Sequence, residues 1–298
     1  RVITCALDGE VRLTDINQEA KITRTELLGS RNNFVAKFDF QPGSSHVFLS
    51  AGQDGTICLY DTRQPPDLDT GPQVAVDLSG IGGCTAIAFD PCSAGCLFSV
   101  GCEDPLVRTY DMRKLLFDSP SSTTAVQGFA VREQLADGCC SSDTEMEKFQ
   151  LSKGPSGLAY TASGELIVNL RGAHIYRFDA QRPANQMDKE GVALSTEVLN
   201  EYRGRVNDET FAKEVCVMHD DSCVASGGDC GHLFIWDRVS GALILQKRGD
   251  GHIVNCVTPH PFLPLLAVSG IDSDVKLFGL GNSNGGKPTE EVTMRERV

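Results

Sequence analysis

The sequence predicts an all-β propeller, in which four-stranded sheets repeat along the chain, and two observations carry this prediction. A strand–turn–strand unit with a Gly-rich turn and a closing aromatic–Asp pair recurs, and apolar residues two apart alternate with more polar ones inside it. The clearest copies are Leu49–Asp61, Phe98–Asp111 and Val224–Asp237, and weaker copies are Ile3–Asp15, Leu166–Asp179 and Leu266–Phe278. Self-similarity of this kind is the signature of a repeat architecture.

The spacing of the repeat predicts the domain organisation. The units end near residues 15, 61, 111, 179, 237 and 278. Blades of this kind run to about 40–45 residues, so the intervals from 111 to 179 and from 179 to 237 are longer than one blade requires. We therefore expect one propeller over residues 1–279 with loop insertions at 115–156 and 180–213, and a flexible tail over 280–298. The first insertion is rich in Ser, Thr, Gly and acids and predicts an exposed loop; the second predicts a helix around Thr196–Arg203.

The number of blades follows from the six visible units. The first unit begins at its middle strands, and Arg1 is followed at once by strand-like sequence. We expect that this chain comes from a longer protein with seven blades, and that the first blade and part of the second are absent from this chain. A closed six-bladed ring is the alternative.

Tight turns inside the units indicate a structural network. Asp54, Asp104 and Asp272 occupy one equivalent turn position, and Asp54 is followed by a Gly, which tolerates the positive φ of a hairpin turn. These features resemble WD repeats, in which such an Asp commonly joins the His of a Gly-His pair. Only Gly251-His252 keeps that pair, so the resemblance implies an incomplete network in the other blades. Trp236, the sole Trp, is interpreted as a blade-packing residue.

Composition narrows the classes of partner. The net charge of −13 disfavours direct nucleic-acid binding but leaves a histone or other basic protein open as a partner. Most of the 12 Cys sit in apolar strand patterns, which indicates reduced core cysteines. The apolar runs are too short to cross a bilayer, and we expect a protein of the nucleus or cytoplasm.

No enzymatic or metal site is predicted. Zinc needs four converging ligands, and the candidates lack a C-x-x-C pair; they are Cys216, His219, Cys223, Cys230 and His232. Gly80–Gly83 lacks the Lys-Ser/Thr of a phosphate-binding loop. The acidic pairs at 220–221 and 290–291 lie in turn and tail sequence. We expect no catalysis, no metal and no cofactor.

Two consecutive units end in the same short motif. One closes with Tyr60, Asp61 and Arg63, and the next with Tyr110, Asp111 and Arg113. An aromatic–Asp–X–Arg ending resembles the box of substrate receptors of the cullin-4 RING ubiquitin ligase. The resemblance implies that Arg63 and Arg113 face the adaptor, damaged-DNA-binding protein one. Arg suits this role because its rigid fork of donors binds oxygen atoms bidentately, as Lys does not.

The resemblance extends beyond the boxes to one branch of these receptors, that of cullin-4-associated factors six and eight and the WD- and tetratricopeptide-repeat protein. The segments that carry it are Cys5–Arg12, Val107–Lys114, Tyr202–Gly204, Val224–Asp237, Gly249–Asp250, Val254–Val257, Pro259–Pro261 and Leu266–Asp272. The chain departs from the branch at Gly204-Arg205, where Gly-His is usual, and at Phe278-Gly279, where Trp is usual.

The leading hypothesis is therefore a non-catalytic receptor that links an unknown protein substrate to the ligase. The alternative is a WD-repeat scaffold outside ubiquitination, such as a histone- or chromatin-binding module. A propeller enzyme is a third and weaker possibility.

Overall fold

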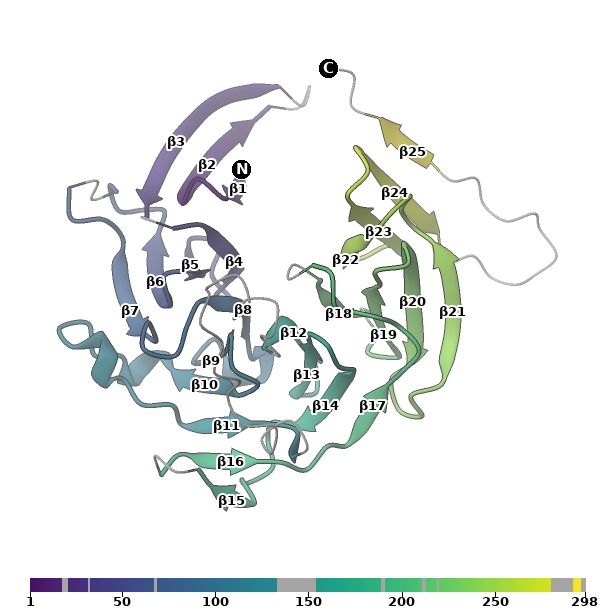
Figure 1. Ribbon diagram of the computed structural model, residues 1–298. Coiled ribbons are helices and arrows are strands. Elements are labelled where there is room, and N and C mark those ends of the chain that lie inside the picture. The colour runs from purple at the N-terminus through teal and green to yellow at the C-terminus, as the bar shows by residue number, and fades with distance from the viewer. Residues whose placement is uncertain are drawn as a thin grey trace. The chain divides into compact units, whose positions relative to one another are not determined.

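A computed structural model describes residues 1–17, 21–31, 33–66, 69–132, 154–188, 191–210, 213–218 and 220–279, and the backbone of 292–295. These residues form strands, three short 3-10 helices and connecting turns. The strands assemble into six sheets, which confirms the all-β class (Figure 1). Among the described residues, no helix has the length and apolar character needed to cross a membrane.

Two compact units divide the chain, and each carries three of the sheets. The first unit comprises 1–155 and 183–196, and the second 156–182 and 197–298. The sheets of the first unit are β1 (Val2–Cys5), β2 (Glu10–Ile16) and β3 (Ile22–Ser30); β4 (Val35–Phe40), β5 (Val47–Gly52), β6 (Thr56–Asp61) and β7 (Gln73–Asp77); and β8 (Cys84–Phe89), β9 (Leu97–Cys102), β10 (Val107–Asp111) and β11 (Gln127–Phe129), extended by β16 (Ala193–Ser195) and β15 (Gln186–Met187).

The second unit has three four-stranded sheets. They are β12 (Pro155–Tyr160), β13 (Glu165–Leu170), β14 (Ile175–Asp179) and β17 (Asn200–Tyr202); β18 (Val215–Val217), β19 (Cys223–Gly227), β20 (His232–Asp237) and β21 (Leu243–Arg248); and β22 (Val254–Pro259), β23 (Leu265–Gly270), β24 (Asp274–Gly279) and β25 (Val292–Arg295). The 3-10 helices, all in the first unit, are η1 (Pro91–Ser93), η2 (Met112–Lys114) and η3 (Pro120–Ser122).

The repeat endings predicted from the sequence fall at or near the ends of β6, β10, β14, β20 and β24, each the third strand of its sheet in chain order, and of β2, the middle strand of the sheet β1-β2-β3. Local chemistry explains this agreement. Gly9 and Gly55 adopt φ of +77° and +79°, and Asp54 Oδ1 accepts the Thr56 backbone N–H at 3.0 Å, so the Asp-Gly pairs close the hairpins that lead into β2 and β6.

The core lies between neighbouring sheets within each unit. One apolar cluster joins the second and third sheets of the first unit, through Leu49 and Ile57 on one side and Phe98 and Tyr110 on the other. In the second unit a comparable cluster packs Trp236 against Ile175 and Tyr202. Within each unit, neighbouring sheets thus pack against each other through their apolar faces.

The insertions differ from their predicted structure. The helix expected around Thr196–Arg203 is wrong, because Asn200–Tyr202 forms β17 and pairs antiparallel with β14, Ile175 opposite Tyr202. The exposed edge of β14 needs backbone partners, and this pairing overrides the local preference of the segment. The predicted loop over 115–156 contains η3 and β11; its residues 133–153 lie outside the described part of the chain.

Sheet pairing also occurs between the two predicted insertions and within the predicted flexible tail. β16 adds to the outer edge of β11 in parallel, with Gly128 opposite Leu194. Within the tail 280–298, β25 pairs antiparallel with β24, with Leu277 opposite Val292. In both cases the sheet is extended on its outer side by a strand that the repeat pattern did not predict.

Candidate functional site

The two aromatic–Asp–X–Arg boxes have the same geometry. Asp61 Oδ1 accepts the backbone N–H of Arg63 at 3.0 Å and its Nε–H at 2.8 Å, while Oδ2 accepts an Nη2–H at 2.6 Å. Asp111 makes the corresponding contacts with Arg113 at 2.9, 2.9 and 2.7 Å. The Asp side chain therefore both closes the turn after the strand and holds the guanidinium in one orientation.

Burial separates the residues of each box into an anchor and an exposed group. Tyr60 and Tyr110 are buried, and their rings stack on Phe48 and Phe98 at centroid distances of 4.8 and 5.7 Å. The side chains of Arg63 and Arg113 are 62% and 70% exposed. Because a guanidinium has five donors, the contacts to Asp leave the Nη1 edge of each Arg available to oxygen acceptors outside the chain.

The sheets that carry the two boxes are neighbours in the first unit. They share one apolar cluster, and β4 packs against β8. The boxes follow β6 and β10, which are the equivalent third strands of these sheets. The two Arg side chains thus belong to the same end of adjacent sheets.

Each guanidinium lowers the pKa of its neighbouring carboxyl group. Hydrogen bonds from Arg63 lower the pKa of Asp61 to about 2, and those from Arg113 lower the pKa of Asp111 to about 2. A depressed pKa means that the pair is formed above the usual carboxyl pKa and is lost as the pH falls toward 2. Both pairs are therefore intact throughout the neutral range.

Removing the guanidinium should raise the pKa of the neighbouring carboxyl group. In Arg63→Ala we expect the pKa of Asp61 to rise toward the usual Asp value of about 3.9, while that of Asp111 stays near 2. Carboxyl carbon chemical shifts followed by NMR from pH 1.5 to 6 measure both groups in one titration. An unchanged Asp61 midpoint in the variant contradicts the bidentate geometry.

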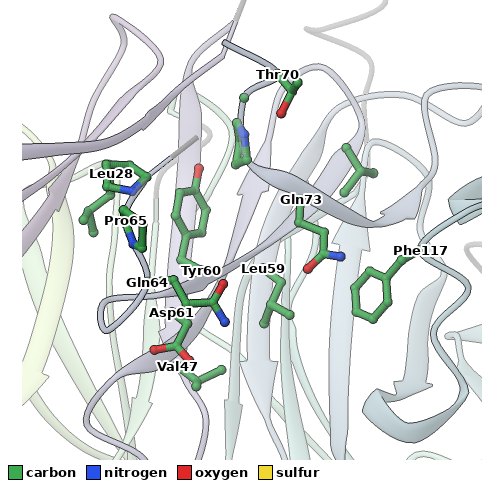
Figure 2. A pocket seen from close by; sticks show the side chains of 14 residues that line it. Leu28, Val47, Leu59, Tyr60, Asp61, Gln64, Pro65, Thr70, Gln73 and Phe117 are labelled. Atoms are coloured by element: carbon green, nitrogen blue, oxygen red, sulfur yellow. The ribbon is translucent and has the colours of Figure 1, made fainter. Parts of the chain in front are cut away.

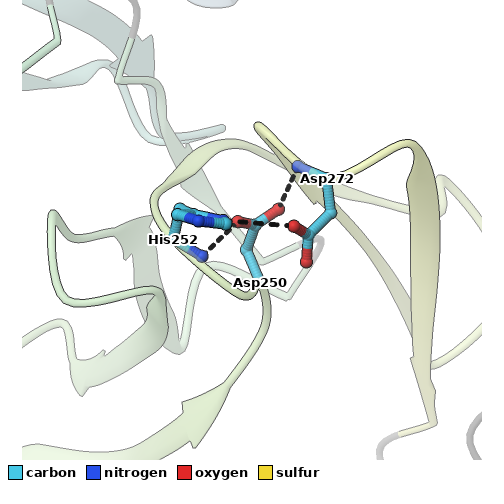
Figure 3. A group of neighbouring side chains, drawn as sticks. All are labelled: Asp250, His252 and Asp272. Carbon is cyan, nitrogen blue, oxygen red and sulfur yellow. Dashed lines mark hydrogen bonds and ion pairs between the residues drawn. The ribbon is translucent and has the colours of Figure 1, made fainter.

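The predicted turn network is assembled differently in each sheet. His252 Nδ1 lies 3.4 Å from Asp272 Oδ1, and the buried Asp250 accepts the backbone N–H groups of His252 and Asp272 at 2.7 and 3.0 Å (Figure 3). Asp272 Oδ2 also accepts the Gly251 N–H at 2.6 Å. These carboxylates are occupied by backbone donors, which is the chemistry of a structural turn rather than of a metal centre.

Arginine takes part in the other two turns. Arg31 Nε lies 3.2 Å from Asp54 and its Nη1 donates to Ser50 Oγ at 3.2 Å, while Arg108 forms a bidentate pair with Asp104 at 2.7 and 2.8 Å. The sequence did not indicate a role for Arg31, which occupies the position of Asp250: the backbone N–H of each donates to the carbonyl of an equivalent turn glycine, Gly9 for Arg31 and Gly231 for Asp250, at 3.1 and 3.0 Å. Asp250 was also missed.

The remaining candidates of the sequence analysis lie in the second unit. Trp236 is fully buried, and its Nε1–H donates to the Arg203 carbonyl at 2.8 Å. Cys216 and Cys223 pack against an apolar cluster, and Cys230 and His232 flank the turn before β20. His219 lies outside the described residues. Among the described His, Cys, Asp and Glu residues, one group of three has potential metal-ligand atoms within 4.8 Å of one another. This group is Asp250, His252 and Asp272.

Comparisons with known proteins agree with this architecture. The family model for the WD domain, G-beta repeat, matches residues 22–61, which end at Asp61 of the first box. Among solved structures, the β-propeller domain of Cps50 (Swd1) from Myceliophteria thermophila superposes with a TM-score of 0.65 at 18% identity, covering 94% of this chain and 80% of that one. This likeness confirms the propeller fold.

Curated relatives are similar over shorter stretches. Human DDB1- and CUL4-associated factor 6 is 47% identical over 77 residues, or 26% of this chain and 9% of that protein. The Schizosaccharomyces pombe WD repeat protein iqw1 is 39% identical over 31% of this chain and 11% of its own length. Human WD and tetratricopeptide repeats protein 1 is 40% identical over 32% and 13%. The chain is therefore a WD-repeat β-propeller protein that shares part of its sequence with a DDB1- and CUL4-associated factor and with WD and tetratricopeptide repeats protein 1.

Proposed function

We propose that this chain is the docking platform of a substrate receptor, which links a target protein to the cullin-4 RING ubiquitin ligase by binding the adaptor damaged-DNA-binding protein one. The observation that carries the proposal is the pair of identically built Asp-X-Arg turns on adjacent sheets, each with an exposed guanidinium fixed by its own Asp. The similarity to human DDB1- and CUL4-associated factor 6 supports the same adaptor. In this role the protein binds and positions and performs no catalysis, and it acts in the nucleus or cytoplasm.

Pre-orientation explains why Asp precedes Arg in both boxes. A free Arg side chain loses rotamer entropy when a partner fixes it. Here Asp61 and Asp111 hold Arg63 and Arg113 before the adaptor arrives, so less entropy is lost on binding. Arg63→Lys and Arg113→Lys keep the charge but not the planar fork. We therefore expect these variants to bind the adaptor much more weakly than the wild type.

Affinity purification of the full-length protein from cells tests the proposal. We expect the wild type to recover the adaptor together with cullin-4. The double variant Arg63→Ala/Arg113→Ala should recover at most about a tenth as much adaptor, because a few anchor residues carry most of the binding energy of an interface. Equal recovery by both proteins excludes the adaptor contact. Recovery of histones that is insensitive to both changes favours the alternative, a scaffold for basic proteins.

A further inference from the structure

A cleft of about 680 Å³ opens beside the first box (Figure 2). Its floor is formed by the end of β6, including Tyr60 and Asp61, and one wall by the start of β7 at Gln73. Pro65, Pro66 and Pro72 from the connecting loop, Leu28 and Val47 from the adjoining strands, and Phe117 complete the apolar part of the lining.

The cleft exists because β6 and β7 separate before β6 ends. Their pairing stops at Leu59 opposite Gln73, after a register shift at Ile57/Cys58. Pro72 follows directly at the end of β7 nearest the cleft, and a proline has no N–H with which to continue the ladder. The loop therefore diverges from Tyr60 and Asp61 and leaves space between the two strands.

Phe117 reaches this cleft from the second box. After Asp111, η2 leads to Leu115, which packs against the core shared by the two sheets. Thr123 then fixes the turn, because its Oγ1 accepts the Leu116 N–H at 3.1 Å and lies 3.5 Å from the Ala75 carbonyl of β7. The segment that begins at one box thus ends beside the other.

The lining combines the chemistry of both boxes. Asp61 lines the cleft and holds Arg63, and Phe117 lines it four residues after Arg113. A partner that contacts Arg63 therefore lies at the edge of the cleft. An interface needs a buried apolar anchor as well as polar contacts at its rim, and this cleft lies directly beside the polar contacts of the first box.

We propose that this cleft takes one large apolar side chain of the adaptor, presented beside oxygen acceptors that receive the free N–H groups of Arg63. The inference rests on the proposed function and deepens it, since it assigns the apolar anchor of the same interface. Leucine, methionine and phenylalanine side chains have the required chemistry. Gln64 and Gln73 on the lining supply amide groups for the backbone that carries the anchor.

A matched pair of substitutions tests the inference. Phe117 lines the cleft and is 40% exposed, whereas its neighbour Leu116 is 48% exposed and is not part of the lining. In binding assays between the purified full-length chain and purified damaged-DNA-binding protein one, we expect Phe117→Asp to weaken the Kd about 10-fold or more, because a charge replaces an apolar wall. Leu116→Asp should change it less than about 2-fold.

A second variant covers the possibility that Phe117→Asp disturbs the turn. Thr70 is exposed at the cleft, so Thr70→Trp fills the space without altering the core; we expect it to weaken the Kd about as much. Circular dichroism and thermal melting establish that each variant is folded.

The possible outcomes separate this inference from the proposed function. If Arg63→Ala/Arg113→Ala abolishes binding while Phe117→Asp and Thr70→Trp bind normally, the receptor role stands and the cleft assignment is overturned. Equal losses in Phe117→Asp and Leu116→Asp also overturn it, since they indicate a general charge effect. If the wild type does not bind the adaptor, both the function and the cleft assignment fail.

Discussion

Replacing Trp236 with Ala should lower the free energy of unfolding by about 3–5 kcal/mol, the usual cost of emptying a buried aromatic site. Trp236 is fully buried, stacks on Phe234 at a centroid distance of 5.7 Å and packs near Tyr202 at 6.2 Å. Its removal leaves a cavity in the cluster that joins two sheets of the second unit and leaves the Arg203 carbonyl without its indole donor.

Two controls separate these contributions. Trp236→Phe keeps an aromatic ring but loses the N–H, and should cost about 1–3 kcal/mol. Val239→Ala, three residues along at an exposed position, should stay within about 0.5 kcal/mol. Urea denaturation gives all three values. Unfolding is followed by circular dichroism rather than by Trp fluorescence, because two of the variants lack the sole Trp. A loss below 1 kcal/mol for Trp236→Ala is incompatible with this packing.

Replacing Arg31 with Met should cost about 2–3 kcal/mol, less than the 3–5 kcal/mol of a fully buried pair because Asp54 is partly exposed. The Arg31 side chain is 3% exposed, contacts Asp54 at 3.2 Å and donates to the Thr56 carbonyl at 2.8 Å. Methionine fills similar volume but leaves these acceptors without their donor inside the first unit.

An exposed arginine of the same unit serves as the control for Arg31. Arg24, whose side chain is 66% exposed, pairs with Glu26 at 3.2 Å on β3, and Arg24→Met should change stability by less than about 1 kcal/mol. Urea midpoints and slopes for both variants provide the comparison. Equal stability of Arg31→Met and wild type would show that the turn network contributes nothing.

The parts of the fold that depend on local chemistry could be predicted from the sequence. The hairpins before the strands that end each repeat follow from alternation and from turns such as Asp54-Gly55, whose conformation needs only neighbouring residues. The strands missed at β11, β16 and β17 form because edges such as that of β14 need partners. That requirement comes from tertiary pairing, which a short segment does not encode.

The same distinction holds for the candidate site. The Asp61–Arg63 and Asp111–Arg113 contacts join residues two apart, so the motif alone indicated residues that the structure joins directly. The cleft combines Leu28, Tyr60, Gln73 and Phe117 from separate strands and turns. Its formation depends on the end of the β6–β7 pairing and on the Thr123 contact to β7, and neither is visible in a linear pattern.

The most direct test of the receptor role is the Kd between the purified full-length chain and purified damaged-DNA-binding protein one. The matched control is Arg203→Ala, because Arg203 is 71% exposed and pairs with Glu201, two residues earlier, at 2.6 Å, outside either box. We predict that Arg63→Ala/Arg113→Ala weakens the Kd at least about 10-fold while Arg203→Ala leaves it unchanged. Equal affinities for the wild type and the double variant would contradict the role assigned to the two boxes.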